Sequence, residues 1–307
     1  MQRPYLAFAD NKPRASSLLF KMAAEKNAQV MREKTPDERR EMQYKLAERR
    51  PSPPDVAVTE ELCAGVPCEW IEPACARHNK VILYIHGGSW MMGNLKSARP
   101  VGAYLAEISS YKVLVAEYRL TPEYPYPAGL EDCFAVYVHL LEQGYPPENI
   151  ALFGDSAGGN LALALAHKLR EAGLGLPCAL GLASPVVDFE GSAMWLQKPD
   201  LLFVAMPEGE LDIFTTYAPP EKWEEPLISP VMGDLSGFPP ILIHVGGDEA
   251  LAVDCAAFAE KAHKQGVQVL TKIWREMFHN FSVVSATLRE SRQSMTEMAE
   301  FFVKYLD

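Results

Sequence analysis

The sequence has no long apolar run, either at its beginning or within it. No stretch approaches the ~18–20 uninterrupted apolar residues that a membrane-spanning helix needs. The opening residues, Met1-Gln2-Arg3-Pro4-Tyr5, lack the apolar core of a signal peptide. We therefore expect a cytoplasmic protein without stable membrane insertion.

Basic residues are in the minority, because 29 Lys and Arg stand against 40 Asp and Glu, for a formal net charge of −11. Such a chain gains nothing from phosphate contacts, so nucleic acid is not an expected partner. An anionic membrane surface would repel it. The 307 residues, 48% of them hydrophobic, suffice for one large α/β domain with an appendage or for two small domains.

The six cysteines lack the spacing of a metal or redox motif. No pair is separated as C-x-x-C, and no cysteine–histidine cluster matches a zinc site. Without an export signal we expect reduced and mostly buried thiols. A disulfide among Cys63, Cys68 and Cys75 stays open, because these three are close in sequence.

Glycine is absent from the first fifty residues, which are rich in good helix formers. They predict helices over 15–32 and 36–50, the second with Pro36 at its first helical position. The run Pro51-Ser52-Pro53-Pro54 ends any helix and forms a stiff linker. We expect 1–50 to be separable N-terminal cap helices.

Beyond the linker, apolar runs of strand length alternate with helical stretches. Residues 56–60 and 67–71 are expected to pair as a hairpin. Repeated β-then-α units predict a mostly parallel sheet with helices on both faces, and such sheets have their sites at the carboxyl ends of strands. The predicted strands are 81–86, 112–118, 150–154, 179–183, 241–245 and 267–274, and the predicted helices are 98–110, 128–143, 157–172 and 251–265.

One interval, 189–227, separates two strands by far more than the usual loop. Its many aromatic residues indicate that it packs on something, and with the N-terminal helices it is expected to form a lid. An apolar face of the first helix is the expected contact. The aromatic residues are Trp195, Phe203, Phe214, Tyr217 and Trp223, and the face consists of Leu18, Leu19, Phe20 and Met22.

Gly154-Asp155-Ser156-Ala157-Gly158 fits the pattern G-x-S-x-G between a predicted strand and a predicted helix. A serine in this sharp turn has a strained backbone, and the glycines leave room for substrate and neighbouring chain. The first N–H groups of the helix point toward an incoming carbonyl oxygen. We predict that Ser156 is a nucleophile, and that Asp155 points away and accepts local backbone donors. The alternative is a helix start that binds a phosphate or nothing.

His86-Gly87-Gly88-Ser89-Trp90 follows directly after an apolar strand. Backbone N–H groups of this loop, together with that of Ala157, are placed to form an oxyanion hole beside the serine. His86 is expected to shape the loop rather than to act as a base, because it precedes the serine. An ordinary strand-ending turn is the alternative.

Chains with this kind of serine turn order their triad as serine, acid and histidine. Three histidines follow Ser156 and a plausible acid. His244 lies inside a predicted strand and His263 inside a predicted helix, so a structural and a solvated role are expected for them. His279 lies in a loop at the carboxyl end of the last predicted strand. We therefore predict His279 as the base.

The sequence constrains the acid less tightly. Asp248 follows one predicted strand and Asp188 follows the preceding strand, so both can reach the site. We predict that Asp248 orients His279, with Asp188 as the second candidate. Glu249 is expected to be a solvated or structural neighbour.

Together these motifs resemble the hormone-sensitive-lipase-like branch of the α/β-hydrolases, which includes many bacterial esterases. The resemblance extends from about residue 81 to the C-terminus, and the family's cap corresponds here to 1–50 and about 190–225. The motifs that carry it are H-G-G-S-W at 86–90, Y-R-L-T-P-E at 118–123, P-A-G-L-E-D at 127–132, G-D-S-A-G-G-N at 154–160, Gly247-Asp248 and Phe278-His279.

The resemblance implies an α/β-hydrolase fold whose catalytic domain is 51–307, and a serine carboxylesterase that cleaves short-chain acyl esters through an acyl-enzyme. It implies no metal or organic cofactor. A small ester is the expected partner, and a homodimer is left open. The implied triad is Ser156, Asp248 and His279, and the implied oxyanion hole is formed by the N–H groups of Gly88, Ser89 and Ala157.

Three positions depart from the family pattern. Ser89 replaces the third glycine of H-G-G-G, Asn280 replaces the usual glycine after the histidine, and Glu249 replaces the usual Pro or Val after the acid. None removes a predicted catalytic atom, but each can narrow substrate choice. Amides, peptides and thioesters suit the same triad. The intact His279 disfavours a non-catalytic receptor or interaction module of hydrolase ancestry.

Overall fold

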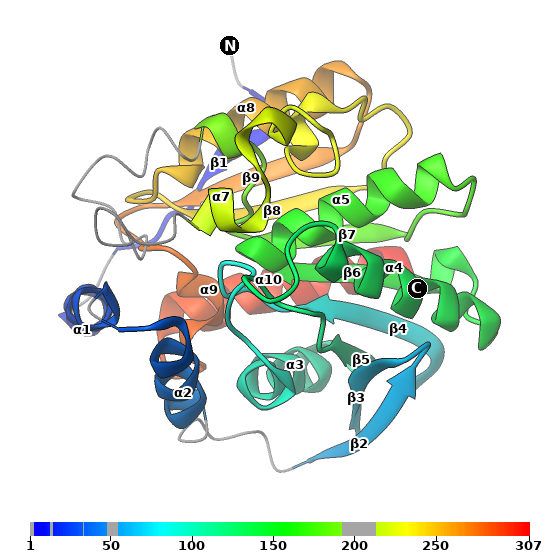
Figure 1. The fold of residues 1–307 in the computed structure, drawn as a ribbon, viewed down its shortest axis with the longest axis horizontal. Coiled ribbons are helices and arrows are strands. Elements are labelled where there is room, and N and C mark those ends of the chain that lie inside the picture. The colour runs from blue at the N-terminus through cyan, green and yellow to red at the C-terminus, as the bar shows by residue number, and fades with distance from the viewer. Residues whose placement is uncertain (1–2, 13–14, 33, 48–54, 192–212) are drawn as a thin grey trace.

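A nine-stranded sheet forms the centre of the protein, in the order β1-β9-β8-β7-β6-β4-β5-β3-β2. The computed structural model describes residues 3–12, 15–32, 34–47, 55–191 and 213–307. Helices cover the sheet on both sides (Figure 1). The strands are β1 (Leu6–Phe8), β2 (Val56–Cys63), β3 (Val66–Pro73), β4 (Arg77–Ile85), β5 (Tyr111–Ala116), β6 (Ile150–Asp155), β7 (Ala179–Ala183), β8 (Ile241–Gly246) and β9 (Val269–Trp274).

Most of the sheet is parallel. Neighbours from β5 through β4, β6, β7, β8 and β9 to β1 all pair in parallel, whereas β2 and β3 pair antiparallel with each other and β3 pairs antiparallel with β5. The predicted α/β architecture is confirmed, and the predicted hairpin is longer than expected, because every residue from Val56 to Cys63 has a partner on β3.

The helices occupy the intervals between strands, as the alternation predicted. A final pair, α9 and α10, was not predicted. The helices of four or more described residues are α1 (Ala15–Arg32), α2 (Pro36–Ala47), α3 (Leu95–Ser109), α4 (Ala128–Glu142), α5 (Ala157–Glu171), α7 (Ile213–Tyr217), α8 (Leu251–Lys264), α9 (Phe281–Val284) and α10 (Arg289–Leu306).

Two apolar layers hold the helices to the sheet, because successive side chains of a strand point to opposite faces. On β4, Val81, Leu83 and Ile85 pack in one cluster with residues of α4, α5 and α8. Ile82 and Tyr84 pack in the other cluster, with residues of α3 and α10. Both faces of the strand are thus buried, which explains why it reads as an unbroken apolar run.

The N-terminal segment is more than a pair of cap helices. Residues Leu6–Phe8 form β1, which pairs in parallel with β9 at the edge of the sheet. Thr271 N–H donates to Tyr5 O at 2.9 Å, and Ala9 N–H donates to Ile273 O at 2.9 Å. The expected boundary at residue 50 therefore differs from the structure. Three residues are too short a strand for periodicity to reveal.

Deleting residues 1–12 is expected to lower the free energy of unfolding by about 2–4 kcal/mol. The deletion removes a few backbone hydrogen bonds of about 1 kcal/mol each, together with the apolar contacts of the buried Tyr5. Urea unfolding followed by circular dichroism measures the change. An unchanged midpoint and slope would show that β1 adds nothing to the sheet.

Helix α1 contacts the segment that follows β9 through one of the four predicted apolar side chains. Phe20 packs against a cluster that contains Trp274, Phe278 and Phe281. The remaining three, Leu18, Leu19 and Met22, are exposed. Of the predicted aromatic insert, Trp195 and Phe203 lie outside the described residues.

No helix in the described ranges is both long and apolar enough to cross a membrane.

Candidate active site

The predicted nucleophile lies in a strained turn between β6 and α5. Ser156 has φ 52° and ψ −118°, a conformation that a non-glycine residue rarely adopts. The turn is tight: a Cβ added to Gly158 would lie 2.0 Å from the Ile85 carbonyl oxygen. Glycine at this position therefore lets α5 begin directly against the end of β4, with Ser156 at the helix N-terminus.

His279 lies beside this serine, although 123 residues separate them in sequence. Its Nε2 is 3.0 Å from Ser156 Oγ, within hydrogen-bond distance. The histidine follows β9 and precedes α9, and its neighbours Phe278 and Phe281 are buried against Trp274. The apolar anchors on both sides fix the loop, so the imidazole is held toward the serine.

The carboxylate that contacts His279 belongs to Glu249, which corrects the expectation for Asp248. Glu249 Oε2 is 2.6 Å from His279 Nδ1. Its other oxygen, Oε1, accepts from Ser184 Oγ at 2.6 Å and from Gly246 N–H at 2.6 Å. Glu249 is 7% exposed. Donors on both oxygens hold this buried carboxylate as the orienting partner of the imidazole.

Asp248 points the other way at the same turn. Its Oδ2 lies 2.5 Å from Lys21 Nζ on α1, and about a third of the Asp248 side chain is exposed. The turn after β8 is closed by a hydrogen bond from Glu249 N–H to Gly246 O at 3.3 Å. Adjacent residues in the turn face opposite sides, and this alternation is not visible in the letters of the sequence.

The second candidate acid, Asp188, contacts local backbone. Its Oδ1 accepts from Gly191 N–H at 3.1 Å.

The other two histidines lie in the elements that the sequence predicted for them. His244 is fully buried on β8, where burial lowers its pKa to about 3. His263 is exposed on α8, with its ring 5.2 Å from that of Tyr5.

The loop predicted to form the oxyanion hole has three successive residues with positive φ. The values are 124° for Gly88, 56° for Ser89 and 57° for Trp90. This explains why glycine is usual at the position of Ser89, since other residues occupy this region at a cost. Within the described chain, the N–H groups of Gly88 and Ser89 donate to no acceptor. They are free to bind a substrate oxygen.

Ala157 supplies the third predicted N–H group. As the first residue of α5, it has no carbonyl acceptor within the helix. Gly88, Ser89, Ser156 and His279 line one cavity. The geometry thus brings the predicted nucleophile, base and oxyanion donors to one place, at the carboxyl ends of β4, β6 and β9.

A family model described as the alpha/beta hydrolase fold matches residues 82–283. The chain belongs to this family. Among curated relatives, an acetyl-hydrolase of Streptomyces hygroscopicus is 38% identical over 82% of the chain and 83% of its own length. An esterase of Acinetobacter venetianus is 36% identical over the same shares, 82% and 83%.

Solved structures place the hydrolase in the hormone-sensitive-lipase branch, as the motifs predicted. An esterase of the bacterial hormone-sensitive-lipase family superimposes with a TM-score of 0.88 at 32% identity, covering 96% of this chain and 100% of that one. A homologue of that family from a metagenome library gives a TM-score of 0.86 at 34% identity, with the same coverage of 96% and 100%.

Asp155 links three parts of the site of this hydrolase. Its Oδ1 accepts from Tyr84 OH at 2.8 Å and from Gly87 N–H at 2.9 Å, and its Oδ2 accepts from Asn280 Nδ2 at 2.9 Å. Burial raises the pKa of Asp155, although these donors oppose the shift. The side chain therefore ties the predicted oxyanion loop (residues 86–94) and the histidine loop (residues 275–280) to the serine turn, so its contacts reach beyond the local backbone donors that were expected.

The departure at residue 280 has a conformational explanation. Asn280 has φ 59°, in the left-handed region that glycine occupies most readily and that asparagine tolerates better than most residues. Its side chain gains the hydrogen bond to Asp155. In this hydrolase, asparagine thus keeps the turn of the histidine loop and adds a tie to the serine turn.

His86 shapes the oxyanion loop, as expected from its position before the serine. Its Nδ1 is 2.8 Å from Gly87 O, and its ring stacks on Tyr118 with 4.5 Å between centroids. Burial lowers the pKa of His86, which favours a neutral ring that donates through Nδ1. Tyr118 OH also donates to His86 O at 2.8 Å.

Aromatic packing connects the cap insert to the oxyanion loop. The ring of Trp90 stacks on Tyr217 at 4.6 Å and lies 5.8 Å from Phe214, both on α7. Phe189 and Trp223 extend the cluster. The expectation that the aromatic insert packs on something therefore holds for its described part, and its contact is the loop of the site.

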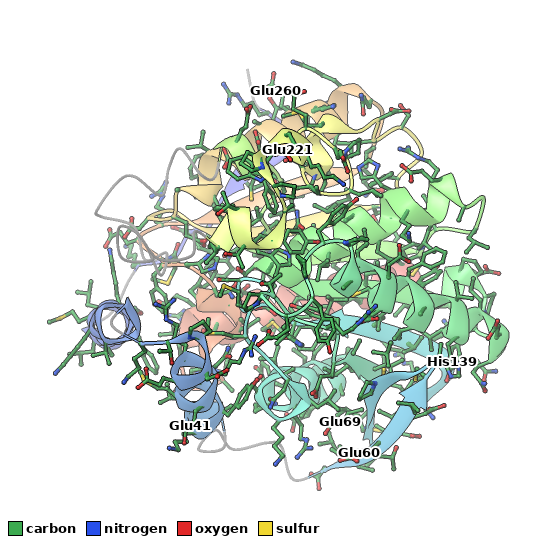
Figure 2. All side chains as sticks on the ribbon, in the orientation of Figure 1. Glu41, Glu60, Glu69, His139, Glu221 and Glu260 are labelled. Carbon is green, nitrogen blue, oxygen red and sulfur yellow. The ribbon has the colours of Figure 1, made fainter. Side chains whose placement is uncertain are left out.

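One group of side chains in the described residues has ligand types and spacing suited to a metal. Glu61, Cys63 and His139 offer atoms within 4.8 Å of one another. His139 lies at the periphery of the molecule (Figure 2), and β2 is four strands away from β6. Glu61 already accepts from Trp70 Nε1 and lies 3.3 Å from His139 Nε2. All six cysteines are free thiols.

Proposed function

We propose that this carboxylic-ester hydrolase cleaves short-chain acyl esters with Ser156 as nucleophile, His279 as base and Glu249 as the orienting acid. The observation that carries the proposal is one continuous chain of contacts. Ser156 Oγ lies 3.0 Å from His279 Nε2, and His279 Nδ1 lies 2.6 Å from Glu249 Oε2. Nucleophile, base and acid in this order are the arrangement that activates a serine hydroxyl.

In the first half of the reaction, Ser156 Oγ attacks the ester carbonyl while His279 Nε2 takes the serine proton. Glu249 accepts the N–H at Nδ1, which fixes the tautomer with Nε2 free and then stabilises the imidazolium. The alcohol leaves with the proton from Nε2. In the second half, water attacks the acyl-enzyme with His279 again as base, and the carboxylic acid and Ser156 are released.

The negative oxygen of each tetrahedral intermediate would be bound by the N–H groups of Gly88, Ser89 and Ala157. The first two groups donate to no acceptor among the residues that the structure describes, which supports this assignment. Removing one such donor typically costs about 10²–10³-fold in rate. Since the donors are backbone groups, Ser89 can supply its N–H as the usual glycine does, and Ser89 also lines the cavity.

The size of the cavity supports short acyl groups. It has a volume of about 230 Å³. A smaller hollow of about 70 Å³ shares Val101, Val283 and Val284 with it. Gln43 of α2 lines the larger cavity, so the N-terminal cap supplies part of the wall. We propose that the cap limits chain length in this way and excludes water from the acyl site.

A panel of p-nitrophenyl esters tests the proposal. Acetate and butyrate esters are expected to give a burst of one nitrophenolate per chain followed by turnover. Esters longer than about eight carbons should react at least 10-fold more slowly in kcat/KM, because the cavity holds few methylene groups. The absence of a burst and of turnover with every ester would refute the proposed activity, whereas equal rates across the panel would refute only the short-chain preference.

Other acyl substrates are the second candidate. The relative from Streptomyces hygroscopicus is named an acetyl-hydrolase, which supports an acetyl group as the acyl part of the substrate of this chain. Amides and thioesters use the same triad, so acetylated amines and acetyl thioesters belong in the same assay. A cytoplasmic location and a homodimer remain predictions, which fractionation and measurement of the mass in solution would test.

A further inference from the structure

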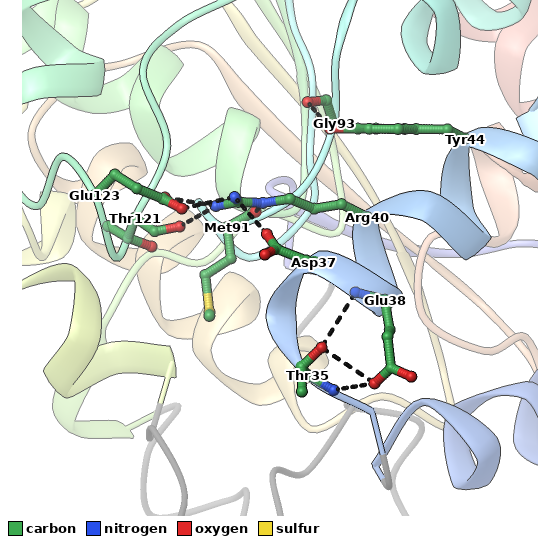
Figure 3. A network of polar contacts seen from close by, with 9 residues as sticks. All are labelled: Thr35, Asp37, Glu38, Arg40, Tyr44, Met91, Gly93, Thr121 and Glu123. Atoms are coloured by element: carbon green, nitrogen blue, oxygen red, sulfur yellow. Dashed lines mark hydrogen bonds and ion pairs between the residues drawn. The ribbon is translucent and has the colours of Figure 1, made fainter.

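Helix α2 of the cap is attached to the oxyanion loop by two side chains one turn apart. Arg40 Nε donates to Met91 O at 2.7 Å, and Tyr44 OH donates to Gly93 O at 3.3 Å. Figure 3 shows the Arg40 side chain extending from α2 to Met91, Thr121 and Glu123. The oxyanion loop therefore receives support from a helix that lies outside the sheet domain.

The guanidinium of Arg40 is held firmly at this position. Its Nη2 donates to Thr121 O at 2.8 Å, and its two terminal nitrogens bind the two oxygens of Glu123 at 2.8 and 2.7 Å. Only 16% of the Arg40 side chain is exposed. A planar fork with a bidentate carboxylate has little rotational freedom. Arg40 can therefore fix the position of the Met91 carbonyl.

Two peptide units connect Met91 to the oxyanion hole. The carbonyl of Met91 and the N–H of Met92 belong to one peptide unit, and Met92 N–H donates to Gly88 O at 2.9 Å. The carbonyl of Gly88 and the N–H of Ser89 belong to the next. Carbonyl and N–H point in opposite directions in a trans peptide. When Gly88 O is held by Met92, Ser89 N–H therefore points away from Met92.

We propose that Arg40 is a positioning residue for the oxyanion hole. Its hydrogen bond to Met91 O orients the 91–92 peptide, the Met92–Gly88 hydrogen bond orients the 88–89 peptide, and Ser89 N–H is thereby aimed at the substrate oxygen. The positive charge at the start of this chain polarises each hydrogen bond in the same sense, which strengthens the last donor. This inference rests on the proposed oxyanion hole and adds the residue that sets its geometry.

A second peptide also holds Gly88 O: Met91 N–H donates to it at 3.0 Å, and the carbonyl of that peptide, Trp90 O, is bound by Thr121 rather than by Arg40. Thr121 N–H and Oγ1 bind Trp90 O at 2.8 and 3.2 Å. Lys21 of α1, a second cation of the cap, binds Asp248 rather than the loop. The Arg40 guanidinium keeps Glu123 ionised by lowering the pKa of this carboxyl to about 2. Arg40 and Glu123 thus stay paired throughout the neutral range.

The test compares Arg40→Met with Lys21→Met in the full-length chain. Each replaces a cap cation by an apolar side chain of similar length, but only the first breaks the link to Met91. Arg40→Met is expected to lower kcat for p-nitrophenyl acetate by about 10- to 100-fold, less than the loss of a whole oxyanion donor, with KM changed less than about 3-fold. Lys21→Met is expected to keep kcat within about 3-fold.

The inhibition constant of a tetrahedral inhibitor gives a second measurement. It would not change if Arg40 only held the cap in place. An alkylboronic acid forms a bond from boron to Ser156 Oγ, which makes a tetrahedral adduct with an oxygen in the proposed hole. Arg40→Met is expected to raise its inhibition constant by the same factor by which kcat falls. In Arg40→Ala, added methylguanidinium at millimolar concentration is expected to restore part of kcat.

An unchanged kcat and an unchanged inhibition constant in Arg40→Met would overturn the inference. Equal losses in Arg40→Met and Lys21→Met would do so as well, because general undocking of the cap would then explain both. If Arg40→Met is insoluble, Arg40→Lys takes its place, since lysine keeps the charge but lacks the fork. A wild-type chain that releases no nitrophenolate would instead refute the proposed function itself.

Discussion

Replacing Ser156 with alanine is expected to abolish ester hydrolysis while leaving the fold intact. The substitution removes the Oγ that lies 3.0 Å from His279 Nε2 and adds no volume to the turn. Loss of the nucleophile in a triad typically lowers kcat by about 10⁴–10⁶-fold, with a residue of activity from the oxyanion hole and substrate binding. Turnover of p-nitrophenyl acetate by purified variant and wild type measures the effect.

Asn280→Gly is the matched control for this variant. It changes a residue that lines the same cavity and restores the usual glycine, but it removes no reacting atom. Its kcat is expected to stay within about 10-fold of wild type. If Ser156→Ala kept even a tenth of the wild-type activity, Ser156 would not be the nucleophile, whatever its geometry.

Glu249→Gln is expected to have the second largest effect, and it decides between two adjacent acids. Glutamine fits the same volume but presents an amide to His279 Nδ1, which favours the wrong imidazole tautomer and no longer stabilises the imidazolium. A change of this kind in a serine triad lowers kcat by about 10⁴-fold. The matched variant, Asp248→Asn, breaks only the partly exposed ion pair with Lys21, worth about 0–1 kcal/mol.

Steady-state rates of the two variants, taken beside their thermal midpoints, test this assignment. We expect Asp248→Asn to keep kcat within about 10-fold of wild type. A larger loss in Asp248→Asn than in Glu249→Gln would restore Asp248 as the functional acid and would mean that the turn after β8 reverses in solution. Glu249 also binds Ser184 Oγ and Gly246 N–H, so its replacement can destabilise the fold. The thermal midpoint shows how much of any loss of kcat comes from lower stability.

The contacts of the first fifty residues with the sheet and the site could not be predicted, because their partners lie far away in sequence. Composition predicted two helices there, and both form. Yet β1 joins the edge of the sheet, and Arg40 reaches Met91 across 51 positions. Separability was inferred from a proline-rich linker, but contacts made after folding determine whether a segment can be removed. Periodicity and composition carry no information about such partners.

The sequence by itself determined the chemistry that depends on local patterns. The strand-to-helix turn around Ser156 needs glycines on both sides, the oxyanion loop needs glycine after a strand, and alternating β and α segments need a parallel sheet. Each of these requirements is met by residues adjacent in sequence, because backbone sterics and side-chain periodicity act over a few residues. Fold class, family, nucleophile turn and histidine loop could therefore be predicted.

Only the tertiary structure decided which carboxylate meets His279 and which cap residue supports the oxyanion loop. Asp248 and Glu249 are adjacent acids that follow the same strand, so their position in the sequence does not show which of them contacts His279. Partners from distant segments set the orientation of each side chain. Glu249 binds Ser184 and His279 in the site, whereas Asp248 pairs with Lys21 on the other side of the turn. Which of the two carboxylates faces His279 depends on how the backbone turns between adjacent residues. The free energy that favours one orientation comes from contacts that exist only once the chain is folded.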